Sequence, residues 1–185
     1  AKGICPDNWR SFFTQQYRWA MGSLDLMCSK EFWIASISPM QRVCYLTGML
    51  YYTTTGLSAV FAFMPSIYLL IRNPHVVLWY NLLWALPSLL LTNLYMRYWQ
   101  KTKFPWSAVE CRHVSYYAHL FALWDTIAGT PETWIPTGST TTRSGRYALY
   151  SIVLKLHILL IITTLIGLIS LRIRDGYDWT NFAPL

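Results

Sequence analysis

Residues 43–71, VCYLTGMLYYTTTGLSAVFAFMPSIYLLI, form a run of 29 residues without a charged side chain. About 20 apolar residues are enough for a helix to cross the hydrocarbon core of a bilayer. The run therefore predicts a transmembrane helix, and Pro65 predicts a kink within it. Small residues at four-residue spacing would also form one face on which another helix packs closely. These residues are Thr54, Ser58 and Ala62.

Two further runs have the length and composition of transmembrane helices. Val76–Met96 contains 21 residues without a charge, although Pro87 removes one backbone hydrogen bond. Tyr147–Leu171 is interrupted by only one lysine and one histidine. The first two helices are expected to form a hairpin, and the predicted fold is an all-α membrane protein with three transmembrane helices and two amphipathic interfacial helices.

The composition supports a membrane protein. Only 12% of the 185 residues are charged, while 54% are hydrophobic and 17% are aromatic. That charged share is about half the usual value for a soluble domain. The net charge of +7 reflects few acids, and the basic residues are scattered among apolar runs. This pattern argues against a nucleic-acid-binding surface and favours contact with anionic lipid head groups.

The cysteines and the N-terminal residues bound the class of protein further. The four cysteines lie far apart and form no C-x-x-C pair, so we expect free thiols rather than a disulfide framework or a zinc site. The first residues lack the apolar core of a signal peptide and begin with Ala, which indicates an internal or C-terminal part of a longer protein. The cysteines are Cys5, Cys28, Cys44 and Cys111.

Two charged amphipathic segments are expected to lie flat on the membrane surface. Asp7 and Asn8 can cap a helix in the proline-free stretch Trp9–Trp33. A second surface helix is expected at Val114–Ile127, ending at Gly129 and followed by a Thr-rich loop. The predicted segments are the first interfacial helix (1–42), the transmembrane hairpin (43–98), the second interfacial helix with its loop (99–146), the third transmembrane helix (147–171) and an extracytoplasmic tail (172–185).

The distribution of basic residues predicts the orientation. With the first helix, residues 97–112 and residues 143–146 on one side, that side holds eleven Lys and Arg residues. The other side holds three, which are Arg72, Arg172 and Arg174. The positive-inside rule then predicts a cytoplasmic first helix, and three spans predict a tail outside.

The first surface helix carries the pentad Gln15-Gln16-Tyr17-Arg18-Trp19. Gln15, Arg18 and Trp19 fall within about 100° of arc, on one helix face. An amide and a guanidinium can hydrogen-bond phosphate or sugar oxygens, and an indole can stack on the C–H face of a pyranose ring, so this face suits a phosphorylated sugar. The alternative is an ordinary amphipathic helix whose Trp packs on a neighbour while Arg and Gln face water.

Q-x-x-R-W on a surface helix, followed by two spans, a second surface helix, a Thr-rich loop and a further span, resembles the C-terminal half of processive family 2 glycosyltransferases. This group includes cellulose, chitin and hyaluronan synthases, and the order of segments matches over nearly the whole chain. The resemblance implies that Trp19 positions the acceptor end of a growing glycan and that Gln15 and Arg18 bind the UDP end of the donor. It also implies a plasma-membrane location and transfer of hexosyl units from a UDP-sugar, with a β-1,4-glucan as the first expectation and chitin or hyaluronan next.

Two further sites follow from the resemblance. A loop that covers the nucleotide is expected in the Thr-rich segment, although its Pro-Thr-Gly stretch departs from the bacterial pattern, and an ordinary turn-rich connector is an equal alternative. Lys155 and His157 would line a hydrated glycan channel, the alternative being a snorkelling lysine beside a buried histidine. The residues of this candidate gating loop are Trp134, Thr137, Gly138, Thr140, Thr141 and Arg143.

The family's acidic motifs are missing here, because the eight Asp and Glu residues form no D-x-D pair. Those motifs bind Mg or Mn in a cytosolic nucleotide-sugar domain that we expect before residue 1, and a further span is expected after residue 185. This chain should therefore bind no metal and be inactive alone, with the UDP-sugar, the growing polysaccharide and the bilayer as its partners. The alternative is a non-catalytic channel or transporter fragment, in which the pentad only belongs to an amphipathic helix.

Overall fold

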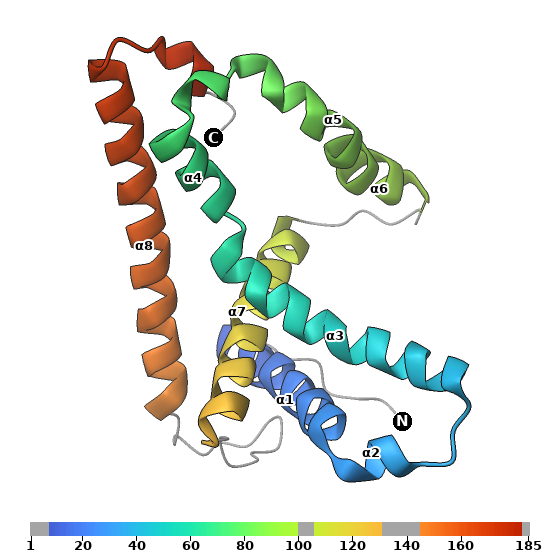
Figure 1. The fold of residues 1–185 in the computed structure, drawn as a ribbon. Helices are drawn as coiled ribbons and strands as arrows, with labels where there is room; N and C mark the ends of the chain where they lie inside the picture. The colour runs from blue at the N-terminus through green and yellow to red at the C-terminus, as the bar shows by residue number, and fades with distance from the viewer. Residues whose placement is uncertain (1–7, 100–105, 131–144, 183–185) are drawn as a thin grey trace. The chain divides into compact units, whose positions relative to one another are not determined.

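The computed structural model describes residues 8–99, 106–130 and 145–182. Within these ranges every regular element is a helix, which confirms the predicted all-α class (Figure 1). The chain divides into two compact units, each with its own hydrophobic cluster. Unit 1 consists of Ala1–Val60 and Glu110–Leu154, and unit 2 consists of Phe61–Val109 and Lys155–Leu185.

Two stretches of the described residues are long and apolar enough to cross a membrane, and they correspond to two of the three predicted spans. Pro39–Arg72 has 34 residues and comprises α3 (Pro39–Phe61) and α4 (Met64–Arg72). Tyr147–Arg174 has 28 residues and lies in α8 (Gly145–Arg174). Both exceed the length of about 20 residues that a bilayer requires.

The kink predicted at Pro65 is a full interruption of the helix. Helix α3 ends at Phe61, and α4 begins at Met64 with Pro65 in its first turn. Proline is favoured there because the first backbone N–H groups of a helix have no partner within the helix.

The second predicted span, Val76–Met96, is not among the described helices that are long and apolar enough to cross a membrane. It starts with two short 3₁₀ turns, and Asn81 Nδ2 donates a hydrogen bond to the carbonyl of Val76 (2.8 Å). This side-chain bond competes with helical pairing, so the regular helix begins only at Leu82. The elements are η1 (Pro74–Val76), η2 (Trp79–Asn81), α5 (Leu82–Leu90), the π-helical η3 (Leu91–Tyr95) and α6 (Met96–Trp99).

Unit 1 begins with α1 (Trp9–Cys28), which carries the pentad. The backbone N–H of Ser11 donates to Asn8 Oδ1 (2.9 Å), which confirms the predicted cap. Ser29 ends α1, and its hydroxyl accepts from the backbone N–H of Phe32 to cap α2 (Lys30–Ile34). The proline-free stretch is therefore two helices rather than one.

The core of unit 1 forms where α1, α3, α7 and the first turns of α8 meet. Figure 1 shows α1 and α7 side by side within this unit. The described cysteines, all in this unit, are free thiols, as predicted. The buried core residues are Phe13, Tyr17, Ala20, Met21, Leu24, Ala59, Tyr117, Ala118, Phe121, Ala122 and Tyr150.

Helix α7 (Trp106–Ala128) starts eight residues before the predicted Val114 and ends almost where predicted. Gly129 follows it with φ 67°, a left-handed conformation that glycine adopts without strain. Its Ala118 and Ala122 are fully buried, so this helix supplies one wall of a packed core as well as an outward surface.

The packing face of α3 differs from the predicted one. Thr54, Ser58 and Ala62 are all exposed, and the Thr54 hydroxyl donates to the Leu50 carbonyl of its own helix (2.9 Å). Gly56 faces α7 instead: a Cβ there would lie 2.9 Å from the backbone nitrogen of Leu120. The predicted small-residue face of α3 is therefore not the face that packs on α7.

Unit 2 has a smaller cluster, and the C-terminal segment belongs to it. Arg172 Nε and Nη2 donate to the carbonyls of Leu70 and Ile71 (2.7 and 3.0 Å), which satisfies the end of α4. Gly176 (φ 92°) turns the chain into η4 (Trp179–Phe182), where Phe182 is buried. The segment predicted as an extracytoplasmic tail is therefore folded up to residue 182, and its side of the membrane stays a prediction.

Candidate functional site

Helix α1 has two faces of opposite character. Its buried face contains Phe13, Tyr17 and Leu24, all packed in the core of unit 1. At 100° per residue, the centre of the Gln15–Trp19 face lies about 170° from the centre of the buried face. The pentad therefore serves two roles, because one of its residues is in the core and three others face away from it.

The outward face leaves the indole accessible. Trp19 is 53% exposed, and Gln15 and Arg18 are half-buried on the same side of the helix. An exposed ring that is not used for packing can stack on a sugar, and the neighbouring amide and guanidinium offer donors to oxygen ligands. This combination of side chains therefore forms a candidate ligand-binding surface within unit 1.

The buried face carries a polar cluster. The Tyr17 hydroxyl of α1 donates to Asp125 Oδ2 of α7 (2.6 Å), and the Tyr150 hydroxyl of α8 donates to the same oxygen (2.5 Å). The Thr130 hydroxyl donates to Asp125 Oδ1 (3.4 Å). Asp125 is 4% exposed, so these hydrogen bonds lie in the core, where an acceptor left unpaired costs the most free energy.

Aromatic rings surround this cluster. Tyr150 stacks on Phe121 with ring centroids 4.3 Å apart and an interplanar angle of 14°. It also lies against Tyr17 and Phe13, at centroid distances of 6.0 and 5.6 Å. These contacts join α1, α7 and α8 in one packed layer and exclude water from the carboxylate.

A second buried polar group lies between α3 and α7. His119 is fully buried, its Nδ1 is 2.8 Å from the Thr55 hydroxyl, and its Nε2 has no hydrogen-bond partner among the described residues. The Thr55 hydroxyl also donates to the carbonyl of Tyr51 (2.7 Å), so Nδ1 must carry the proton and donate to Thr55. Burial lowers the pKa of His119 from 6.5 to about 4, and the ring is neutral at pH 7.

Sequence patterns did not predict these buried groups as a site. Tyr17 and Asp125 are 108 residues apart, and Asp125 and Tyr150 are 25 apart. The only available signal was that a carboxylate and a histidine stood in otherwise apolar helical stretches. Such residues are rarely buried without partners, but the sequence does not identify the partners.

The other predicted site residues belong to unit 2 or lie outside the described residues. Lys155 is exposed and His157 half-buried, and both belong to unit 2 in α8. Two residues apart on a helix means about 200° of rotation, so these side chains leave α8 on nearly opposite sides. The candidate gating loop from Trp134 to Arg143 lies outside the described residues.

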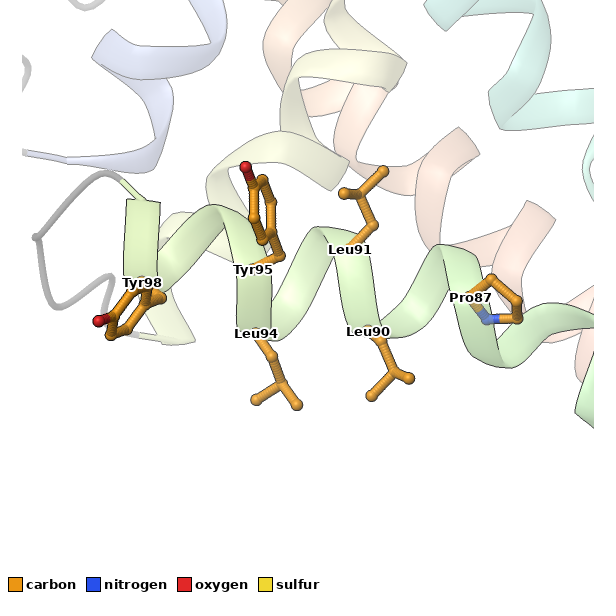
Figure 2. A pocket seen from close by; sticks show the side chains of 6 residues that line it. All are labelled: Pro87, Leu90, Leu91, Leu94, Tyr95 and Tyr98. Atoms are coloured by element: carbon orange, nitrogen blue, oxygen red, sulfur yellow. The ribbon is translucent and has the colours of Figure 1, made fainter.

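Unit 2 contributes an apolar surface along a single helix. Figure 2 shows Leu90 and Leu94 pointing to one side of this helix and Leu91 and Tyr95 to the other. All four are at least half exposed, and Tyr98 is 87% exposed. A helix that is apolar on both sides and unburied needs an apolar environment that its own unit does not provide.

Comparison with known proteins adds no family: no protein-family profile, no curated protein and no solved structure matches this chain.

Proposed function

We propose that this chain is the membrane and acceptor-binding part of a processive polysaccharide synthase. It would bind the UDP end of a UDP-sugar, hold the end of the growing glycan and help to move the polymer across the membrane. A β-1,4-glucan is the first candidate product. The observation that carries this proposal is the outward face of α1, where Trp19 is exposed beside Arg18 and Gln15.

The chemistry of these three side chains suits sugar transfer. When the glycosyl bond to UDP breaks, negative charge develops on the leaving diphosphate, and a positioned guanidinium stabilises it. Gln15 adds a neutral donor and acceptor for phosphate or sugar hydroxyls. Trp19 offers a flat surface on which the terminal sugar can stack, and stacking permits sliding by one unit because it involves no fixed set of hydrogen bonds.

The packing of unit 1 supports three crossings of the membrane rather than two. Helix α1 precedes the span Pro39–Arg72, α7 follows it, and yet the two helices share one core. If Pro39–Arg72 crosses the bilayer, the chain must cross back before α7 begins. The helical stretch Leu82–Trp99, whose side chains of described burial are exposed, supplies about 27 Å at 1.5 Å per residue, close to the thickness of the hydrocarbon core.

The proposal also includes a plasma-membrane location with α1 in the cytoplasm. The basic residues of the chain favour that orientation, because most of them would then lie on the cytoplasmic side. UDP-sugars would reach the α1 face from that side.

Ligand titration tests the proposal on the chain in lipid nanodiscs. Arg18→Ala should weaken UDP binding by ~10-fold or more, since a hydrogen bond to a charged group contributes about 1.5–3 kcal/mol. Trp19→Ala should weaken binding of a cello-oligosaccharide and leave UDP affinity nearly unchanged. In the intact synthase, Trp19→Ala should abolish polymer synthesis and leave membrane insertion unaffected.

Lys30→Ala is the matched control, because Lys30 is an exposed cation on the neighbouring α2. It should change neither affinity. Equal UDP affinities for wild type and Arg18→Ala would contradict the proposed role of Arg18. An absence of both UDP and oligosaccharide binding in wild type would leave the channel or transporter alternative.

A further inference from the structure

The rotation of α1 about its own axis decides where its outward face points. With side chains at a radius of about 5–6 Å, a rotation of 20° moves the atoms of that face by ~2 Å. Displacements of about 1 Å can cost a reacting site a factor of 100. A side chain that fixes the rotation of α1 therefore affects the affinity of any ligand bound to the outward face.

Apolar packing alone does not hold the rotation well. The buried face of α1 consists mainly of Phe13, Ala20, Met21 and Leu24, and hydrophobic contacts of this kind are not directional. Tyr17 is the polar exception, 2% exposed and bonded through its hydroxyl to Asp125. A hydrogen bond has a preferred distance and angle, so it selects one rotation.

Asp125 is itself held from two directions. Tyr150 of α8 donates to the same Oδ2 at 2.5 Å, and the Thr130 hydroxyl donates to Oδ1 at 3.4 Å. The backbone N–H of Thr130 also donates to the Asp125 carbonyl (3.0 Å). Contacts within α7 and from α8 therefore hold the carboxylate without help from α1. Its fixed position can then orient Tyr17.

We propose that Asp125 is a positioning residue for the outward face of α1. Through Tyr17, which lies between Gln15 and Arg18 in the chain, it sets the direction in which Arg18 and Trp19 point. Asp125 touches no ligand itself. Its importance for ligand binding rests on the proposed function, whereas its control of helix rotation does not.

Tyr17→Phe is the primary test variant, because it removes one hydroxyl and keeps the ring that packs on Tyr150. Tyr150→Phe removes the other donor to the same oxygen without breaking the bond to α1. Tyr147→Phe is the matched control, since its ring packs on Phe13 (5.6 Å) and its hydroxyl makes no hydrogen bond to described residues. Circular dichroism would confirm that each variant is folded.

The rotation is measured between spin labels on Gly22 of α1 and Trp124 of α7, in a background with the native cysteines replaced by serine. A Cβ at Gly22 meets nothing within 4 Å, and Trp124 is 66% exposed, so both positions accept a label. The distance distribution should broaden or shift in Tyr17→Phe, change less in Tyr150→Phe and stay unchanged in Tyr147→Phe. An unchanged distribution in Tyr17→Phe would overturn the proposal.

UDP titration of the same variants separates this inference from the proposed function. If both hold, Tyr17→Phe lowers UDP affinity at least ~10-fold, while Tyr147→Phe does not. If the two hydroxyls only stabilise the fold, Tyr17→Phe and Tyr150→Phe should lower the UDP affinity equally. That result would contradict a positioning role of Asp125. Wild type that binds no UDP refutes the proposed function alone, because the spin-label distances still decide the role of Asp125.

Discussion

His119 shows how burial controls a single side chain in this protein. Its ring lies between α3 and α7, edge-on to Tyr52 at a centroid distance of 4.9 Å. Within the part of the chain that the structure describes, its one hydrogen bond goes to Thr55 and its buried Nε2 lone pair meets no donor. A charged imidazolium there would place a second N–H without an acceptor in the core, which explains why the pKa is lowered to about 4.

This lowered pKa predicts that acid weakens the fold. Between pH 6.5 and about 4 the unfolded chain binds a proton at His119 and the folded chain does not. The free energy of unfolding should therefore fall as the pH falls, by about 2 kcal/mol from pH 7 to pH 5 for this residue. His119→Gln cannot titrate and should lose that part of the pH dependence in thermal or denaturant unfolding.

His113→Gln is the control for this experiment, because His113 is exposed on the same helix. It measures how replacing an exposed imidazole on α7 by an amide changes the unfolding by itself. If His119→Gln kept the full acid sensitivity between pH 7 and pH 5, the buried histidine would not be its source.

Asp125 is a buried carboxylate that depends on donors from other helices. A carboxylate at this depth requires donors, and the structure supplies phenol hydroxyls from two other helices. Its role became visible only with its partners in place.

At the level of helices, the contact between α3 and α7 depends on one glycine. A Cβ at Gly56 would lie 2.9 Å from the Leu120 nitrogen and 3.0 Å from the His119 carbonyl carbon. These are backbone atoms of α7 and cannot move aside like the end of a flexible side chain. Gly56→Ala must therefore separate the two helices.

We expect Gly56→Ala to lower the free energy of unfolding by about 1–3 kcal/mol, the usual cost of overpacking a core. Gly48→Ala on the same helix is the control, since nothing lies within 4 Å of a Cβ there. Removing a glycine from an open helical position should be neutral or stabilise by up to ~1 kcal/mol. Equal melting temperatures for the two variants would show that α3 and α7 do not pack as described.

The C-terminal end of α4 is capped by a side chain from another helix. Its last carbonyls accept hydrogen bonds from Arg172, which also forms an ion pair with Asp175 (2.8 Å). The charge pattern predicted Arg172 only as one of three basic residues outside the membrane. The structure gives it a specific task in unit 2, because a forked guanidinium can satisfy several acceptors at once.

At the scale of the whole molecule, an experiment can decide how many times the chain crosses the membrane. Three crossings place Gly22 and Gly129 on one side and His75 and Gly176 on the other. Two crossings, by Pro39–Arg72 and Tyr147–Arg174 alone, would place Gly22 with Gly176 instead. We expect the three-crossing result, because α1 and α7 share one core.

Single cysteines at these four positions, treated with a membrane-impermeant maleimide in sealed vesicles of known orientation, measure the sidedness. The cysteine at position 129 should react from the same side as the cysteine at position 22. If the cysteines at positions 129 and 75 reacted from the same side, the Leu82–Trp99 helix would not cross the membrane. The proposed topology would then be wrong. Detergent-permeabilised vesicles provide the control, since all four thiols should then react.

Much of the fold followed from local rules applied to the sequence. Long apolar runs, one without a charge and one interrupted by a single lysine, predicted both membrane-length helices. Asn8 predicted the start of α1, and Gly129 predicted the end of α7. These features depend on side chains close together in the chain, so periodicity and capping preferences are sufficient. The same rules predicted the shared face of Gln15, Arg18 and Trp19, whose ligand stays a prediction.

Other features depended on contacts between distant parts of the chain. Local patterns missed the delayed start of the helix at Leu82, because the Asn81 side chain bonds a carbonyl outside it. They also selected Thr54 and Ser58 for packing, whereas α7 lies against Gly56. Spacing alone reveals that a helix has a small-residue face but not which neighbour will lie on it.

The sequence by itself thus determined an all-helical chain with membrane-length apolar helices and an amide, a guanidinium and an indole on one helix face. Only the tertiary structure decided which side of α1 is buried, since that depends on Tyr17 meeting a carboxylate 108 residues away. The physical reason is that helix formation is governed by near neighbours, whereas the rotation of a helix is governed by directional bonds to other helices.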